Sequence, residues 1–168
     1  MASIITSIEI SASPAIVREK FLDFPSLPTY TPTGFITSIS PASPTTRPQD
    51  LQKGDKLHCT VGYGKFNITP TLVSNTESEF SWCGSLAGVF TGTHYFRFEE
   101  LDDGKKTRFV HGEDFGGVLA GLYGEGWLGW LVGAREGAVK GFEGFNADFK
   151  GWVEGRSNSD DSNSTPAA

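Results

Sequence analysis

Three residues whose side chains can transfer protons, His94, His111 and Glu113, lie in two neighbouring stretches, 89–101 and 107–115, where polar and apolar residues alternate. Successive side chains of a β-strand point to opposite faces, so residues two apart share a face. The phenylalanines that share a face with these three residues mark it as the interior face. A carboxylate and imidazoles on such a wall could move protons in an aldol cyclisation, a dehydration or an enolisation.

The turn that joins the two stretches sets which residues face each other. Asp103-Gly104 is a favoured centre for a two-residue hairpin turn. Pairing about this centre places His94 opposite Glu113, with Cβ atoms about 5 Å apart, close enough for the carboxylate to bind the imidazole. The same pairing places His111 opposite Phe96. We therefore interpret His94, Glu113 and His111 as the candidate catalytic residues.

Two other interpretations of these residues stay open. The histidine and the carboxylate could do no more than satisfy each other as buried polar groups. Two histidines and one carboxylate could also form a three-ligand metal site. No helix or loop in the sequence spaces its His, Cys, Asp or Glu residues in the manner of a metal site, so we predict no metal and no other cofactor.

The elements that position these residues follow from patterns along the chain. Residues 3–10 predict a strand, and Ser13-Pro14 predicts the start of a helix that ends before Pro25. Pro25, Pro28 and Pro32 leave room for at most one more short helix, around Ser26–Tyr30. Further strands are predicted at 35–40, 55–63, 65–73 and 79–83, and a long helix from after Gly117 to about Val153.

This order of elements predicts an α+β fold. One antiparallel sheet of seven strands would curve around the long C-terminal helix, with two short helices after the first strand, in the arrangement called a helix grip. A cavity is expected between the sheet and the helix. We expect residues 1–155 to form a single ligand-binding domain and residues 156–168, rich in Ser, Asn and Asp, to form a disordered tail.

Composition excludes several classes of partner. A length of 168 residues suits one domain, and 14 basic against 20 acidic residues give a net charge of −6, which argues against nucleic acid. The chain has neither an apolar run of about 20 residues nor a signal peptide. We therefore expect a cytoplasmic protein without integral membrane association. Cys59 and Cys83 are expected to be free thiols.

The cavity wall is predicted to be mostly aromatic. Side chains on the inward faces of the strands, in the proline-bracketed segment and on the apolar face of the long helix should contact a ligand. These predicted ligand-binding residues are Tyr30, Tyr63, Phe66, Phe80, Trp82, Phe90, Phe96, Phe98, Phe109, Phe115, Tyr123, Trp127, Leu131, Arg135 and Phe142. A purely structural role as packed wall explains most of them equally well.

Glycine is concentrated towards the C-terminus: 13 of the 21 glycines lie between Gly112 and Gly155. Each glycine costs about 1 kcal/mol relative to alanine inside a helix, so ordinary packing would not favour them. On a helical wheel most of those in the long helix fall in one sector. This stripe could allow the sheet or a second subunit to approach closely, could make room for a bulky ligand, or could let the helix deform as a gate. A homodimer is therefore left open.

Three segments resemble the START-like (SRPBCC, Bet v 1-type) superfamily, which includes polyketide cyclase/dehydrases and lipid-transport domains. They are Ile8–Val17 with Asp23-Phe24-Pro25, Gly88–Phe96 and Thr107–Gly117. The resemblance implies a helix-grip fold that binds an apolar small molecule between sheet and helix. It also implies that cyclisation, dehydration or isomerisation takes place there in some members.

We therefore expect the protein to bind a polyketide-, polycyclic- or lipid-like molecule and to act as a cofactor-free cyclase, dehydratase or isomerase of a biosynthetic pathway. His94 and Glu113 would be the acid and base, and His111 or Tyr30 would orient an oxygen of the substrate. The alternative is a non-catalytic carrier of lipids, sterols or other hydrophobic metabolites. A stress-type or co-chaperone module that binds another protein is a third class.

Overall fold

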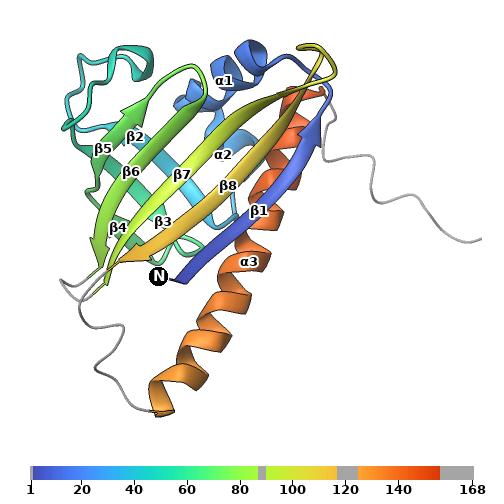
Figure 1. Ribbon diagram of the computed structural model, residues 1–168. Coiled ribbons are helices and arrows are strands. Elements are labelled where there is room, and N and C mark those ends of the chain that lie inside the picture. The colour runs from blue at the N-terminus through green and yellow to red at the C-terminus, as the bar shows by residue number, and fades with distance from the viewer. Residues whose placement is uncertain (1, 87–89, 117–124, 156–168) are drawn as a thin grey trace, which may run out of the picture.

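The computed structural model describes residues 2–86, 90–116 and 125–155. These residues form an α+β fold in which strands and a long C-terminal helix enclose the interior (Figure 1). In chain order the elements are β1 (Ala2–Ile10), α1 (Pro14–Leu22), a 3-10 turn (Phe24–Ser26), α2 (Leu27–Tyr30), β2 (Ile36–Pro41), a second 3-10 turn (Pro48–Asp50), β3 (Leu57–Val61), β4 (Phe66–Ile68), β5 (Thr71–Asn75), β6 (Glu79–Leu86), β7 (Phe90–Leu101), β8 (Lys106–Gly116) and α3 (Glu125–Val153).

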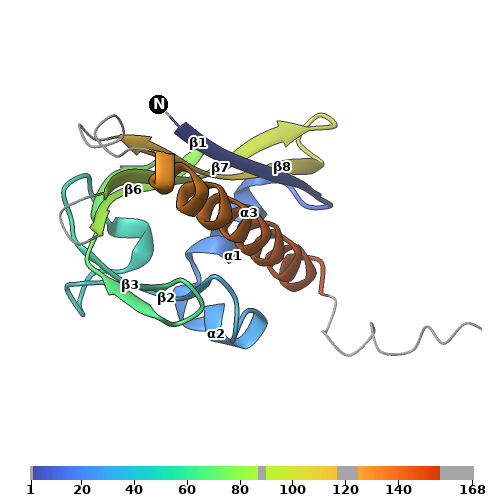
Figure 2. The same cartoon turned by 90° about the horizontal axis from the view of Figure 1, so that it is seen from below.

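The strands form two antiparallel sheets. Five strands are arranged in the order β1-β8-β7-β6-β5, and three in the order β2-β3-β4. An isolated bridge between Lys56 and Thr71 joins the two sheets. Figure 2 shows α3 running between the five-stranded sheet and the three-stranded sheet. The predicted combination of a large antiparallel sheet and a C-terminal helix is confirmed, and the arrangement is that of a helix grip.

The described part of the chain has eight strands in two sheets, so the prediction of one sheet of seven strands is wrong. The stretch 65–73, predicted as one strand, is divided into β4 and β5. Pro70 lies between them, and proline has no N–H to donate to a sheet. β4 pairs with β3, whereas β5 pairs with β6. The chain therefore changes sheets at this proline.

Two short helical segments follow β1. Ser13 has an extended backbone and Pro14 is the first residue of α1, which ends at Leu22. Val17, Phe21 and Leu22 are the buried residues of α1. The ring of Phe21 contacts six phenylalanine rings at centroid distances from 4.5 to 6.1 Å, one of them that of Phe24 just after the helix. Helix α1 thus packs into the same aromatic interior that the sheet and α3 share, with Phe80, Phe96, Phe98, Phe109 and Phe149 around Phe21.

The last turns of α3 supply the interior face of the long helix. Phe142, Phe145 and Phe149, spaced three and four residues apart, are all fully buried. The N-terminal half of α3 extends beyond the start of β1 (Figure 1). The predicted helical residues before Glu125, and the predicted tail 156–168, lie outside the described residues.

The glycine stripe of α3 has different surroundings at different positions. A methyl group on Gly141 would lie 2.6 to 2.9 Å from three side-chain atoms of Phe35, so this glycine lets the chain before β2 approach the helix closely. At Gly137 and Gly144 an added methyl group would meet nothing within 4 Å. Close approach therefore explains Gly141 but not the other two.

The hairpin of β7 and β8 has the predicted turn and register. Asp103 and Gly104 have φ values of 53° and 80°, as a type I′ turn requires, and the Lys105 N–H donates to the Asp102 carbonyl at 3.2 Å. In the resulting register His94 pairs with Glu113. These predictions are confirmed, because two positive φ angles are what an Asp-Gly turn accommodates.

Candidate functional site

The two interior histidines contact each other directly. His94 on β7 and His111 on β8 are 5% and 0% exposed, and their Nε2 atoms lie 2.8 Å apart, at hydrogen-bond distance. They are diagonal neighbours on one face of the hairpin, because His111 pairs with Phe96 and Glu113 pairs with His94. The imidazoles therefore form a pair inside an otherwise phenylalanine-rich interior.

The pair continues into α3 and β1. Asn146 Oδ1 lies 3.1 Å from His111 Nδ1, and Asn146 Nδ2 donates to Thr6 Oγ1 at 3.0 Å. The Thr6 hydroxyl in turn donates to the backbone carbonyl of His111 at 3.1 Å. Asn146 is 2% exposed and Thr6 9%. A buried chain of hydrogen bonds thus connects both histidines with the helix and the first strand; we call Thr6, His94, His111, Glu113 and Asn146 the polar network.

The other end of the polar network reaches Glu113. Its Oε2 lies 3.6 Å from His94 Nδ1, and its side chain is 24% exposed against 7% for that of His94. Gly92 lies beside this carboxylate: a methyl group at Gly92 would be 2.7 Å from Glu113 Oε1. A glycine at this position therefore makes space for the carboxylate at the more accessible end of the network.

Aromatic rings hold both imidazoles in place. The Trp82 ring stacks on His94 with an interplanar angle of 3° and a centroid distance of 4.9 Å. Phe142 stacks on His111 at 11° and 4.1 Å. Because each imidazole has a ring against its face and polar partners at its nitrogens, neither can rotate without losing contacts.

Burial decides the charge of His111. Its pKa is held well below the ordinary value of 6.5, first because the burial penalises the charged form and second because of the neighbouring His94. Hydrogen bonds that the His111 ring donates to the Asn146 side chain and the Phe142 backbone oppose this shift without overcoming it. His111 is therefore neutral at neutral pH.

The residues predicted to line the cavity wall differ in where the structure places them. Most of those on β6, β7, β8 and α3 are buried in the interior, namely Phe80, Trp82, Phe96, Phe98, Phe109 and Phe142, and Phe115 is partly exposed. Tyr123 lies outside the described residues. Only the backbone is described for Phe90, Trp127, Leu131 and Arg135.

Tyr63 and Phe66 do not line the interior as predicted. They are 51% and 46% exposed. Strand β3 ends at Val61, and φ is positive at Gly62, Tyr63 and Gly64, so the alternation of the strand does not continue into this turn. The prediction that these two aromatic residues line the cavity wall is therefore wrong.

Tyr30 lies in the interior but apart from the histidines. It is 5% exposed, and its ring stacks on Trp152 near the C-terminal end of α3, with a centroid distance of 5.5 Å. Its hydroxyl has no hydrogen-bond partner among the described residues. Burial raises its pKa, helped by the negative charges of Asp23 and Asp148. Among the described residues, the rings that Tyr30 contacts are those of Phe145, Phe149 and Trp152, and none of these belongs to the polar network.

Asn146 and Thr6 are the site residues that the sequence analysis missed. Asn146 lies at helical spacing from Phe142 and Phe149, and Thr6 alternates with Ile4 and Ile8. In each case a polar residue stands among apolar ones on a buried face, which requires a hydrogen-bond partner. That requirement was the signal by which both could have been found.

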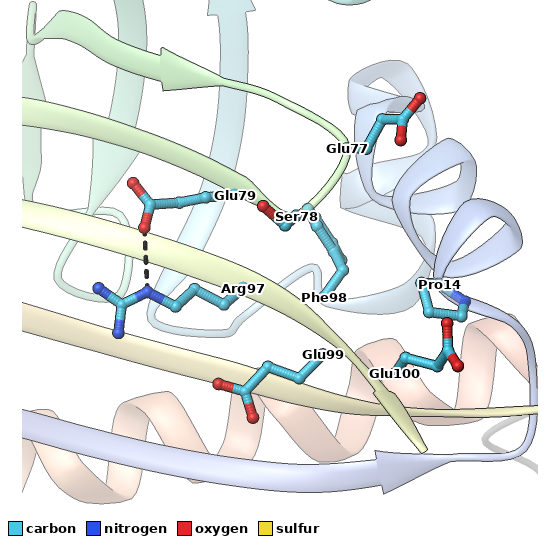
Figure 3. A pocket seen from close by; sticks show the side chains of 8 residues that line it. All are labelled: Pro14, Glu77, Ser78, Glu79, Arg97, Phe98, Glu99 and Glu100. Atoms are coloured by element: carbon cyan, nitrogen blue, oxygen red, sulfur yellow. Dashed lines mark hydrogen bonds and ion pairs between the residues drawn. The ribbon is translucent and has the colours of Figure 1, made fainter. Parts of the chain in front are cut away.

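Two surface pockets of the described residues do not involve the polar network. One, of about 460 Å³, lies between the start of α1, the turn before β6 and the end of β7, and holds the Arg97–Glu79 ion pair at 2.9 Å (Figure 3). Its lining residues are Pro14, Glu77, Ser78, Glu79, Arg97, Phe98, Glu99 and Glu100. The other, of about 370 Å³, is lined by residues around Lys20 and Arg47. Such charged pockets do not suit an apolar ligand.

Within residues 2–86, 90–116 and 125–155, no group of three or more His, Cys, Asp or Glu side chains could hold a metal ion. In the same ranges no helix has the length and hydropathy needed to span a membrane.

Comparisons with known proteins agree with the fold. A family model described as polyketide cyclase / dehydrase and lipid transport matches residues 1–154. No curated protein sequence matches the chain significantly. Among solved structures, a START superfamily protein from Mycobacterium smegmatis is 15% identical with a TM-score of 0.63, covering 92% of this chain and 99% of its own.

Two other solved structures are similar over nearly the whole chain. The Zhui aromatase/cyclase from a Streptomyces species is 14% identical with a TM-score of 0.60, covering 95% of this chain and 98% of its own. The protein TTHA0849 from Thermus thermophilus is 13% identical with a TM-score of 0.63, covering 94% of this chain and 100% of its own. At these identities the likeness concerns the fold, which is that of the START-like superfamily.

Proposed function

Because the chain belongs to the polyketide cyclase/dehydrase and lipid transport family, we propose that it binds an apolar small molecule between the five-stranded sheet and α3 and transfers protons to and from it through Glu113 and His94. The observation that carries the proposal is the polar network itself. A line of hydrogen bonds runs through a phenylalanine interior to His94, whose Nδ1 lies 3.6 Å from a carboxylate that is 24% exposed, next to a glycine that leaves it space.

The chemistry that suits these residues is proton transfer at a carbon next to a carbonyl group. The Glu113 carboxylate would accept the proton, and the C–H electron pair would form the C=C bond of an enolate. Return of the proton to another carbon completes an isomerisation. Its delivery to a β-hydroxyl group that leaves as water completes a dehydration, and attack of the enolate carbon on a second carbonyl forms the ring of an aldol cyclisation.

The ligand class follows from the surroundings of the network. The interior around the network is built of aromatic rings, among them Trp82, Phe96 and Phe142, so an apolar polycyclic or polyketide-like ketone that enters beside Glu113 would meet an apolar, aromatic environment. The energy of binding would come from apolar burial, and the carboxylate would select molecules with an acidic C–H group. No cofactor enters this scheme, since every proton moves between the ligand and residues of the chain.

A non-catalytic carrier of hydrophobic metabolites is the second candidate. The observation that favours it is that His94 and His111 satisfy each other at 2.8 Å and are almost fully buried. In that case the network would only stabilise the interior. The two candidates differ in whether a bound ketone exchanges protons with Glu113.

Exchange of carbon-bound protons tests the proposal. In deuterated buffer, 2-tetralone loses its α-protons, and NMR measures the rate. We expect the protein to accelerate this exchange and the Glu113→Gln variant to lose most of the acceleration, about 100-fold or more. Glu99→Gln is the matched control, because Glu99 is an exposed carboxylate on the same strand as His94, 3.5 Å from Arg108.

The outcomes separate the two candidates. If 2-tetralone raises the thermal stability of the protein while exchange equals that in buffer, the protein is a carrier and the catalytic proposal is rejected. If Glu113→Gln exchanges as fast as Glu99→Gln, Glu113 is not the base. Mass spectrometry of small molecules extracted from the purified protein then narrows the natural ligand.

A further inference from the structure

We infer that Asn146, anchored by Thr6, is a positioning residue that holds His111 in its Nδ1–H tautomer and thereby turns the lone pair of His94 Nδ1 towards Glu113. The tautomer itself can be measured without any ligand. Its role in a reaction rests on the proposed function. The inference follows from the direction of each hydrogen bond in the polar network.

The direction is set at Thr6. A hydroxyl group has one proton, and that of Thr6 goes to the backbone carbonyl of His111 at 3.1 Å. The Thr6 oxygen must therefore accept from the Asn146 amide NH2 group, whose nitrogen lies 3.0 Å away. This arrangement turns the Asn146 carbonyl oxygen towards His111 Nδ1 at 3.1 Å. Since a carbonyl oxygen only accepts, Nδ1 of His111 must bear a proton.

A neutral imidazole has one N–H and one lone pair. Burial and the neighbouring His94 keep the pKa of His111 low, which agrees with a neutral ring. With the proton on Nδ1, the lone pair of His111 is on Nε2, which faces His94 Nε2 at 2.8 Å. The hydrogen bond between the two imidazoles therefore runs from His94 to His111.

His94 then turns its Nδ1 towards Glu113. With the Nε2 proton committed to His111, a neutral His94 and an ionised Glu113 would present two acceptors to each other across 3.6 Å. One proton between these two atoms, on either the imidazole or the carboxyl group, removes that conflict. A proton that Glu113 takes from a ligand therefore finds an acceptor beside it, the lone pair of His94 Nδ1.

Among the described side chains that contact the two rings, no other titratable group competes for this proton. The contacts come from all elements packed against the imidazoles: β1 through Thr6, β6, β7, β8 and α3. Their members are Trp82, Phe96, Phe142, Phe145 and Asn146, besides Glu113 and the histidines themselves. Of these, only Glu113 and the two histidines titrate.

The inner end of the network is closed, because Thr6 returns its proton to the carbonyl of His111 itself. A proton taken from a substrate therefore has no hydrogen-bonded path onward and must leave again through Glu113. Such a site favours reactions that give back the proton they remove, as isomerisation and dehydration do. It does not favour reactions that need net proton transport through the protein.

Long-range ¹H–¹⁵N NMR of the histidine rings in the uniformly ¹⁵N-labelled protein at pH 7 tests the inference. We expect a pyrrole-like shift for His111 Nδ1, a pyridine-like shift for His111 Nε2, and a pyrrole-like shift for His94 Nε2. A protonated Nε2 on His111 in the wild-type protein, or a doubly protonated His111, overturns the inference.

Variants of Thr6 and Asn146 separate positioning from mere packing. Thr6→Val keeps the shape of the side chain but removes the hydroxyl that orients the Asn146 amide, so His111 should shift towards the Nε2–H tautomer. Thr6→Ser keeps the hydroxyl and should retain the wild-type shifts. Asn146→Leu removes the side-chain acceptor, leaving the Phe142 backbone as the other partner of His111, and should shift His111 in the same direction as Thr6→Val. A His111 that stays in the Nδ1–H form in both Thr6→Val and Asn146→Leu rejects the positioning role.

The two proposals fail separately. Absence of 2-tetralone exchange together with the expected ¹⁵N shifts would reject the catalytic function and leave the positioning role of Asn146 in place. Glu113-dependent exchange together with the opposite His111 tautomer would reject the positioning role alone. If both hold, Thr6→Val should slow exchange although Thr6 lies behind both histidines.

Discussion

The pH dependence of stability offers a direct check on the buried His111. Its native pKa is lowered by burial, so the folded protein keeps the ring neutral while the unfolded chain takes up a proton near the ordinary value of 6.5. A lowered pKa on a basic group means that its contribution to stability is complete above pH 6.5. That contribution is lost as the pH falls below 6.5, until the native pKa is reached. The expected sign is therefore a loss of stability on acidification.

The size of the loss follows from proton linkage. Each pH unit in this window lowers the free energy of unfolding by about 1.4 kcal/mol for one group that titrates only in the unfolded chain. Because His111 is 0% exposed, solvent does not weaken the effect. The wild-type protein should therefore lose stability through this residue at about this slope as the pH falls from 6.5 towards the lowered native pKa.

Urea denaturation at several pH values between 5 and 8 measures the slope. His111→Phe keeps a ring against Phe142 and removes the titration, so its free energy of unfolding should be lower at every pH but should fall less steeply on acidification. His58→Gln is the matched control, because it removes an exposed histidine on β3 away from the polar network. Parallel curves for wild type and His111→Phe would refute the assignment of a buried neutral His111.

Other predictions concern single positions in the interior and on α3. Tyr30→Phe should raise the free energy of unfolding by about 1 kcal/mol, because the buried hydroxyl has no partner among the described residues; calorimetry that shows a loss would contradict this. It should also remove the loss of stability above pH 10 that the raised native pKa of Tyr30 predicts. Gly141→Ala should cost about 1–3 kcal/mol by forcing the added methyl group against Phe35. Gly144→Ala, which meets open space, should stabilise the helix by about 1 kcal/mol, and equal effects of the two alanines in urea denaturation would be inconsistent with the close approach at Gly141.

The β7–β8 hairpin shows what could be predicted from the sequence. Asp103-Gly104 specifies a turn with two positive φ angles, and alternation specifies the faces, so the pairing of His94 with Glu113 follows from local rules. The hydrogen bond between His94 and His111 does not follow from them. It joins diagonal neighbours, and the opposed His94 and Glu113 lie further apart, at 3.6 Å.

The role of Asn146 depends on how α3 docks. Helical periodicity places Asn146 at the edge of the apolar face, but the strand that it meets is set by the packing of Phe142, Phe145 and Phe149 against the sheet. Nothing in the local sequence encodes that contact, which joins residues 35 positions apart. The exposed Tyr63 shows the opposite case, where a local glycine-rich turn overrides the alternation of the strand.

The pairing of the first strand with the last one has a consequence for synthesis of the protein. In the described part of the chain β8 is the sheet partner of β1. During synthesis β1 therefore cannot pair until the ribosome has added the residues up to Gly116. Until then it presents unpaired backbone groups, the feature that promotes association with other chains. Thr6 meets Asn146 later still, across a separation of 140 residues. The polar network therefore assembles only when both ends of the domain have come together, and a signal from its hydrogen bonds in a refolding experiment would mark the final step of folding.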